Sequence, residues 1–141
     1  MLIKQLSIFL ENKKGRFNEI TETLGKENIN MTAFTVSENS DFGILRLIVS
    51  KPENALKLLK KNNYAVNVTN VICVQMPNTP GALAKIMNVI NKAEISIEYM
   101  YAFSTGKTAL CIIRPDNPEK TAEILQENKI VLLTENELFD I

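Results

Sequence analysis

The sequence predicts an α+β protein built from two ferredoxin-like βαββαβ units in tandem. The first observation is an internal repeat: apolar and loop residues return after 66 residues, the interval between Gly15 and Gly81. The second is an alternation between strand-like and helix-like apolar spacing, in the same order in both halves of the 141-residue chain. The third is a polar Asn-x-x-Gly turn that precedes the first helical pattern of each half.

The first unit is predicted over residues 1–69. Apolar residues alternate over 2–10, which indicates a strand, and recur at every third or fourth position over 15–27, which indicates one face of a helix. Pro52 suits the first turn of a second helix. The other elements of this unit are strands at 31–38, 43–49 and 64–68, with a turn at 39–41 between the first two.

The second unit is predicted over residues 70–141, with the same order of elements. Its hairpin aligns with that of the first unit at an interval of 64 residues rather than 66, which suggests small compensating insertions. The tail at 135–141 weakly resembles 69–75 and is predicted to add a short edge strand. The remaining elements are strands at 71–76, 95–103, 108–114 and 130–133, and helices at 81–92 and 118–128.

The composition argues against several classes of function. Sixteen basic residues balance sixteen acidic ones, so no surface for nucleic acid or an anionic membrane is predicted. Histidine is absent, which removes the commonest general base and metal ligand, and neither a metal nor another cofactor is expected. No apolar run approaches the ~18 residues of a membrane span. Without a signal peptide, a cytoplasmic protein with Cys73 and Cys111 reduced is expected.

The repeated Asn-x-x-Gly turns are the strongest candidate for a binding site. The start of a helix offers unpaired N–H groups and a partial positive charge, and glycine lets a ligand approach the backbone. Together with an asparagine side chain, these groups suit a small zwitterion. The alternative is that these residues only cap helices. The candidates are Asn12, Gly15, Arg16 and Phe17 in the first unit, and Asn78, Gly81, Ala82 and Leu83 in the second.

A second polar position follows the first helix of each unit, at Asn30 and Ser96, eighteen residues after Asn12 and Asn78. In the predicted topology this residue begins the second strand, away from the first loop of its own unit. It need not face the first loop of its own unit, but across a side-by-side interface of two units it could come close to the first loop of the other. The alternative is a simple turn residue after a helix.

The pattern resembles the ACT domain family. A strand, then Asn78-Thr79-Pro80-Gly81-Ala82-Leu83, then an amphipathic helix and Glu94-Ile95-Ser96-Ile97 is similar to that family's motif, and residues 10–17 with Asn28-Ile29-Asn30 resemble it in the first unit. The resemblance covers essentially the whole chain. It implies a regulatory module that binds small ligands, most often amino acids. It also implies that the units pair side by side into an antiparallel eight-stranded sheet with four helices on one face.

The resemblance assigns roles to the candidate residues. The asparagines would bind the polar ends of the ligand, the helix starts its carboxylate, and the facing strand of a neighbouring unit would complete the site. The residues implied are Asn12, Gly15, Arg16, Phe17, Asn30 and Met31, and Asn78, Pro80, Gly81, Ala82, Leu83, Ser96 and Ile97. Lys14 stands where the family usually has proline, and Arg16 is large where Ala82 is small. The two sites are therefore not equivalent.

Two other classes of function compete with this hypothesis. The first is an acylphosphatase-like hydrolase that would use Arg16 and Asn30, although its glycine-rich phosphate loop is missing. The second is a ligand-independent interaction module that uses an open, partly apolar sheet face, formed by alternate residues of 3–9 and 71–75. A metal chaperone would need Cys-x-x-Cys in the loop, and an RNA-binding domain would need more surface aromatics and a basic face.

The sequence thus predicts a non-catalytic, allosteric regulatory protein that binds a free amino acid or a similar small zwitterion. A homodimer is expected, and a metabolic enzyme or another regulator is the expected macromolecular partner. Nucleic acid and membranes are not expected partners.

Overall fold

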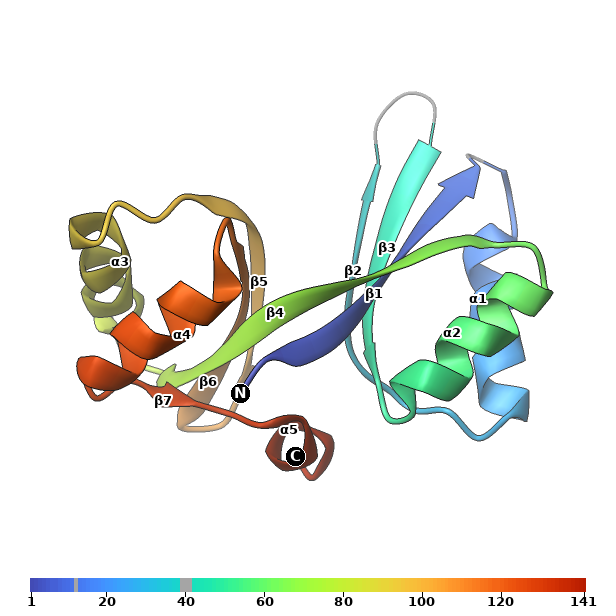
Figure 1. Ribbon diagram of the computed structural model, residues 1–141. Coiled ribbons are helices and arrows are strands. Elements are labelled where there is room, and N and C mark those ends of the chain that lie inside the picture. Colours follow the sequence, from blue (N-terminus) through green and yellow to red (C-terminus); the bar gives the residue numbers. More distant parts are fainter. Residues whose placement is uncertain (12, 39–41) are drawn as a thin grey trace. The chain divides into compact units, whose positions relative to one another are not determined.

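The computed structural model describes residues 1–11, 13–38 and 42–141, so Asn12 and the predicted turn at 39–41 lie outside the described residues. The chain divides into two compact units (Figure 1). The first unit comprises Lys4–Thr69, and the second comprises Met1–Ile3 together with Asn70–Ile141. One strand, β4 (Ala65–Pro77), contributes its beginning to the first unit and its end to the second.

The first unit has the predicted βαββαβ order. Its strands follow the order β2-β3-β1-β4, with antiparallel pairing of β1 to β3 and of β3 to β2. The two helices cover one face of this sheet (Figure 1). The elements are β1 (Ile3–Glu11), α1 (Arg16–Lys26), β2 (Met31–Glu38), β3 (Phe42–Val49), α2 (Pro52–Lys61) and the start of β4.

The second unit repeats this arrangement. In its sheet β4 pairs with β6, and β6 pairs with β5. β7 pairs with β4 on the side away from β6. Helices α3 and α4 cover one face of it (Figure 1). The elements are α3 (Ala82–Lys92), β5 (Ile97–Thr105), β6 (Thr108–Pro115), α4 (Pro118–Glu127), β7 (Val131–Leu132) and α5 (Glu135–Phe139).

Three details differ from the sequence-based expectations. The described residues form seven strands rather than eight, because β4 is both the last strand of one unit and the first of the next. The hairpins align at 66 residues, not 64: Ile8 pairs with Leu45, and Val74, 66 positions after Ile8, pairs with Cys111. The predicted edge strand at the tail is wrong. Residues 135–139 form α5, because Thr134 accepts a 3.2 Å hydrogen bond from the Glu137 N–H and buried Leu138 anchors the turn.

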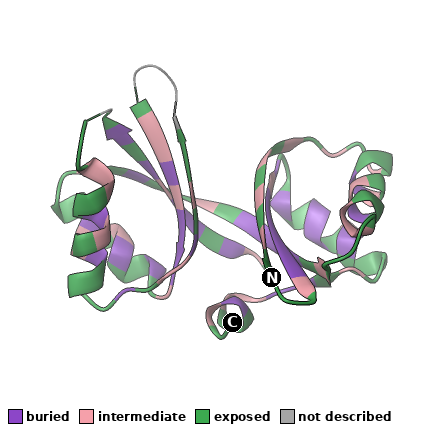
Figure 2. Ribbon diagram, turned by 180° about the vertical axis from the view of Figure 1, so that it is seen from behind, coloured by how far each residue is buried: buried purple, intermediate pink, exposed green. Residues whose placement is uncertain are grey.

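Each unit has its own apolar core between its sheet and its two helices (Figure 2). In the first unit, Ile8 and Leu45 meet Ile20 and Leu24 of α1, and in the second, Val74 and Cys111 meet Ile86 and Ile90 of α3. Burial of this kind stabilises each unit by about 1.5–3 kcal/mol per large apolar side chain.

The other sheet face is not open where the sequence suggested it. Ile3, Gln5, Val71 and Cys73 are all buried, and only Phe9 of that set of apolar candidates is well exposed, at 43%. The buried Gln5 amide is hydrogen-bonded: it donates to Thr69 Oγ1 at 3.2 Å and lies 3.4 Å from Ser7 Oγ. A satisfied amide explains how a polar residue tolerates this position.

The repeat extends to backbone conformation. Among the described residues, four that are not glycine have positive φ, and they form two pairs separated by 66 residues: Asn28 with Glu94, and Asn63 with Lys129. Each follows the end of a helix, where a left-handed residue closes the last turn. The two units therefore share a framework in which differences between equivalent side chains are directly comparable.

Candidate functional site

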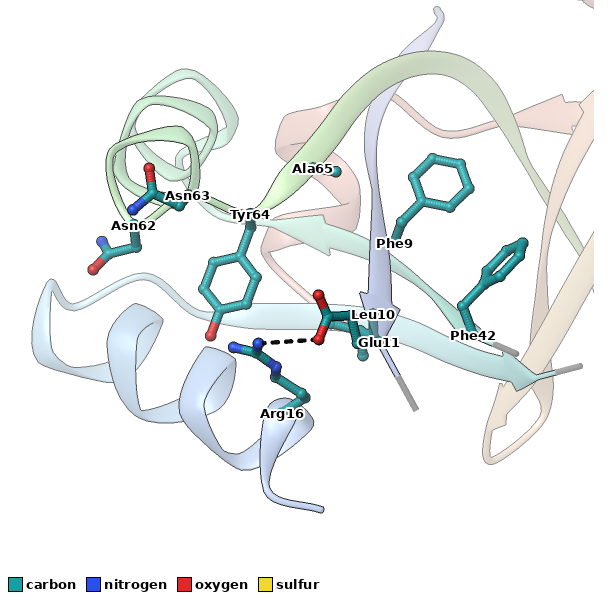
Figure 3. Close-up of a pocket in the computed structure, with 9 residues that line it drawn as sticks. All are labelled: Phe9, Leu10, Glu11, Arg16, Phe42, Asn62, Asn63, Tyr64 and Ala65. Carbon is teal, nitrogen blue, oxygen red and sulfur yellow. Dashed lines mark hydrogen bonds and ion pairs between the residues drawn. The ribbon is translucent and has the colours of Figure 1, made fainter. Parts of the chain in front are cut away.

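A cavity of about 700 Å³ lies in the first unit, at the end of the sheet where β1 gives way to α1 (Figure 3). The connection from α2 into β4 forms its opposite wall, because β4 lies beside β1 in the sheet. Its size falls within the range of small-molecule sites. The lining residues are Phe9, Leu10, Glu11, Arg16, Phe42, Asn62, Asn63, Tyr64 and Ala65.

A network of charged groups crosses this cavity. The Arg16 guanidinium lies 3.5 Å from the Glu11 carboxylate and 3.3 Å from that of Glu19 (Figure 3 shows the first contact). Lys13 pairs with Glu11 at 2.9 Å, and the Tyr64 hydroxyl donates a 2.8 Å hydrogen bond to Glu19. Two cations and two carboxylates thus balance, and the site has both a positive and a negative group to offer.

The network shifts the pKa values of Glu11 and Tyr64. Hydrogen bonding and charge attraction from Lys13, followed by Arg16, hold the pKa of the Glu11 carboxyl below its ordinary 4.5. Burial, followed by the hydrogen bond to Glu19, raises the pKa of Tyr64 above its ordinary 10.0. At neutral pH the site therefore carries an ionised Glu11 and a neutral Tyr64 that can donate a hydrogen bond.

Two aromatic rings form the other end of the cavity. The centroids of Phe9 and Phe42 are 6.0 Å apart with the rings tilted by 59°, a favourable aromatic geometry. Both rings are exposed, at 43% and 38%. Figure 3 shows them beyond Glu11, on the side away from Tyr64. The cavity thus combines a charged end with an apolar end.

The second unit has a cavity at the equivalent place, of about 300 Å³. It lies between the end of β4, the start of α3 and the connection from α4 into β7. Seven of its lining residues stand 66 positions after lining residues of the first cavity: Gln75, Met76, Pro77, Ala82, Lys129, Ile130 and Val131 replace Phe9, Leu10, Glu11, Arg16, Asn63, Tyr64 and Ala65.

The structure brings only part of the predicted site together. Arg16 lines the first cavity, and Pro80 and Ala82 line the second. Gly15 and Gly81 precede α1 and α3 with φ values of 87° and 86°, a conformation that favours glycine, and neither helix has a side-chain cap at that residue. The N–H groups of Arg16 and Ala82 donate to the Lys13 and Thr79 carbonyls, at 3.4 and 3.2 Å, and binding of a ligand by the helix starts stays a prediction. Asn12 lies outside the described residues.

The predicted residues of the second strands do not line either cavity. Asn30 joins β2 to the start of α2: its carbonyl accepts from Ser50 N–H and its N–H donates to Ser50 Oγ, both at 3.0 Å. The Ser96 carbonyl accepts from Asp116 N–H at the equivalent place in the second unit. The neighbouring Met31 and Ile97, and Phe17 and Leu83 at the helix starts, pack against the cores.

Asn78 has a structural contact in the second unit. Its amide donates a 3.1 Å hydrogen bond to the Gly106 carbonyl, and its backbone N–H donates to the Lys107 carbonyl at 2.8 Å. The loop before α3 is thereby fixed to the turn between β5 and β6. The Asn78 side-chain oxygen makes no hydrogen bond within the described residues, so it remains available as an acceptor.

Sequence reasoning missed most of the residues that line the first cavity, including Glu11, Phe42 and Tyr64. The signal that could have found Tyr64 is topological. The predicted ferredoxin-like order places the last strand of a unit beside its first strand, so the residues that enter that last strand lie near the first loop.

The chain is thus a pair of like domains, each with a cavity beside the start of a helix. The whole chain, residues 1–141, matches the family described as the ACT domain pair. The protein therefore belongs to the ACT domain pair family, whose domains are regulatory.

Solved structures share this fold. Protein BT0572 from Bacteroides thetaiotaomicron is 51% identical, with a TM-score of 0.96 over 100% of this chain and 98% of that one. The ligand-free regulatory subunit of aspartate kinase from Thermus thermophilus shares the fold at 13% identity, with a TM-score of 0.65 over 89% of this chain and 93% of that one. The corresponding subunit from Thermus flavus gives 14% and 0.64, over 86% of each chain.

No curated protein matches the chain. Within the part of the chain that the structure describes, no helix has the length and apolar character needed to cross a membrane. The same residues contain no group of three or more His, Cys, Asp or Glu side chains placed to hold a metal ion.

Proposed function

We propose that this protein is a non-catalytic regulator that binds a free amino acid. The observation that carries the proposal is the first cavity, in which the Glu11 carboxylate and the Arg16 guanidinium lie 3.5 Å apart at one end and Phe9 and Phe42 lie at the other. An amino acid carries the complementary set of groups: an ammonium for Glu11, a carboxylate for Arg16 and a side chain for the rings.

The ion network suits exchange with such a ligand. In this structure the Arg16 guanidinium contacts the carboxylates of both Glu11 and Glu19, and the Arg16 side chain is only 34% exposed. A zwitterion that inserts between Glu11 and Arg16 replaces one ion pair with two and leaves no charge unpaired. Glu19, held by Tyr64, keeps the guanidinium in place during this exchange. A ligand that lacks the ammonium would take Arg16 from Glu11 without replacing it and leave that carboxylate to Lys13 alone.

The mechanism we infer is a shift in population between arrangements of the units, driven by a ligand that binds one arrangement better. The ACT resemblance predicts that a neighbouring unit contributes to each site, which would give Asn30 and Ser96 a role. That contribution is part of the proposal. It predicts that Asn30→Ala weakens ligand binding although Asn30 does not line the cavity of its own unit.

A homodimer and a regulated enzyme or regulator complete the proposal. The outermost strand of the first unit, β2, exposes Phe34 at 52% and Val36 at 51%. Half-exposed apolar side chains on an edge strand favour contact with another chain. This observation also favours the second candidate function, an interaction module that needs no ligand. The unpaired thiols of Cys73 and Cys111 are consistent with a cytoplasmic protein.

A thermal-shift screen against the twenty amino acids tests the proposal. A ligand present at 100 times its Kd stabilises the folded state by about 2.7 kcal/mol. For a chain of this length that raises Tm by roughly 5–10 °C. Arg16→Gln should abolish the shift, whereas Lys26→Gln, an equivalent loss of charge at the other end of α1, should leave it intact. If no amino acid shifts Tm, the interaction module becomes the better account.

A further inference from the structure

We propose that the cavity of the second unit binds a small carboxylate that has an apolar body and no ammonium group, such as a 2-oxo acid. This proposal does not rest on the amino-acid site of the first unit, because the residues that carry it belong entirely to the second. It gives the two halves of the repeat different ligands.

The lining of the second cavity carries only positive charge, whereas that of the first pairs a carboxylate with a cation. The network residues Glu11, Arg16 and Glu19 are replaced, 66 positions later, by Pro77, Ala82 and Lys85. No acidic residue lines the second cavity, so nothing in its lining can bind an ammonium group. A ligand with an ammonium would gain no partner there, which selects against amino acids.

Two lysines supply the anion-binding groups. Lys85 and Lys129 both line the cavity, and neither forms an ion pair with any residue that the structure describes. They come from different elements, α3 and the connection from α4 to β7, so two separate segments each offer a positive charge to a carboxylate in the cavity. Gly81 leaves the start of α3 without a side-chain cap, which adds N–H groups that also favour an anion.

The backbone of Lys129 offers a separate readout of its substitution. This lysine has φ of 60°, whereas the first unit places an asparagine, Asn63, at the equivalent position with φ of 66°. Asparagine tolerates the left-handed conformation far better than lysine does. Lys129, like Glu94 at the other left-handed position of this unit, therefore accepts backbone strain that an asparagine would relieve.

The rest of the lining fits an apolar body. Met76, Pro77, Pro80, Ile86 and Ile130 line the same cavity as the two lysines. At about 300 Å³ the cavity is less than half the size of the first, and it holds a short branched chain rather than a large ring system. One carboxylate on an apolar body of five or six carbons matches both features.

Calorimetric titration of the full chain with 4-methyl-2-oxopentanoate at low salt tests the proposal. Leucine, which has the same carbon skeleton with an ammonium in place of the oxo group, is the matched ligand. Lys85→Gln and Lys129→Asn should each weaken binding of the oxo acid about tenfold, the scale of one charged hydrogen bond. Lys129→Asn should also raise Tm, because it relieves the strain. This combination separates a lost ligand contact from a damaged fold.

Two controls complete the design. Glu94→Asn makes the same backbone change at the other left-handed position of this unit, outside the cavity, and should raise Tm without altering binding. Lys120→Gln removes the charge of an exposed lysine on α4 and should leave both Tm and oxo-acid binding unchanged. Retention of oxo-acid binding in Arg16→Gln would support a site separate from the first cavity. Absence of oxo-acid binding, tighter binding of leucine that Lys129→Asn weakens, or equal affinity in both lysine variants and wild type would overturn the proposal.

Discussion

The hydroxyl of Tyr64 donates a 2.8 Å hydrogen bond to the carboxylate of Glu19, which joins the residue before β4 to the first turn of α1. Glu19 in turn lies 3.3 Å from the Arg16 guanidinium. One chain of contacts therefore positions both Tyr64, in the wall of the first cavity, and Arg16, the cation that lines it. In the second unit Ile130 and Lys85 stand at these places, and no equivalent contact is possible between an alkyl side chain and a lysine.

Removing the Tyr64 hydroxyl should weaken amino-acid binding without unfolding the unit. Tyr64→Phe frees Glu19 to compete for Arg16, and the loss of one hydrogen bond is worth about 0.5–1.5 kcal/mol, or roughly threefold to tenfold in Kd. The Kd is measured by calorimetry and the fold by thermal melting. Tyr101→Phe, the same change in the second unit, is the control. An unchanged Kd in Tyr64→Phe would show that the hydroxyl does not position Arg16.

Binding of an amino acid should persist into mildly acidic solution. The pKa of Glu11 is lowered below 4.5 by Lys13 and Arg16, so its carboxylate stays ionised at pH 5. Because a depressed pKa means that the ionised form is favoured in the folded state, the interaction is present above 4.5 and lost as pH falls through the lower, folded pKa. Titrations from pH 8 to pH 3.5 should show constant affinity down to about 4.5 and a decline only below it. A decline centred near pH 6 would contradict this assignment.

The two units differ in one helix cap, which gives a test of the repeat. Asn117 begins α4, and its side chain accepts a 3.1 Å hydrogen bond from the Lys120 N–H. Lys51 is 66 positions earlier with a similar backbone but no side-chain cap. Lys51→Asn should therefore stabilise the protein and Asn117→Ala should destabilise it, each by about 1 kcal/mol. Urea unfolding measures both. The same sign for both variants would show that the units do not share cap geometry.

The two thiols should be inert in the folded protein. Burial raises the pKa of Cys73 to about 12 and that of Cys111 to about 11, so almost no thiolate exists at pH 8. Reaction with a disulfide reagent at pH 8 should therefore be slow and should accelerate in denaturant as the cores open. Cys73→Ala and Cys111→Ala separate the two rates. Rapid reaction of either thiol in native buffer would mean that its strand is exposed.

Much of the fold could be predicted because one pattern occurs twice. The core positions of α1 and α3, such as Ile20 and Ile86, follow from apolar spacing, and the repeat fixes their equivalence. The tail could not be predicted from that pattern, since α5 depends on a local cap by Thr134 that has no counterpart in the first unit. The predicted side-by-side arrangement came from the family resemblance rather than from periodicity.

The candidate site could be predicted at its helix starts, including Arg16, but not along the rest of its lining. Gly15 and Gly81 have sequence signals because positive φ favours glycine. Glu11, Phe42 and Tyr64 have none, because ordinary surface residues become a cavity lining only when the strand order brings three separate segments together. Asn30 was expected to contact the ligand, yet within its own unit its backbone carbonyl and N–H form hydrogen bonds to Ser50.

Calorimetric titration of the wild-type protein and Arg16→Gln with each amino acid that shifts Tm is the most direct test of amino-acid binding. We expect one amino acid to show saturable binding, with one site per first unit. Arg16→Gln should lower the affinity at least tenfold, as expected for the loss of a charged hydrogen bond. Heat that saturates equally in both proteins would contradict the placement of the ligand in the first cavity. No heat with any amino acid, from a protein that melts cooperatively, would contradict amino-acid binding itself.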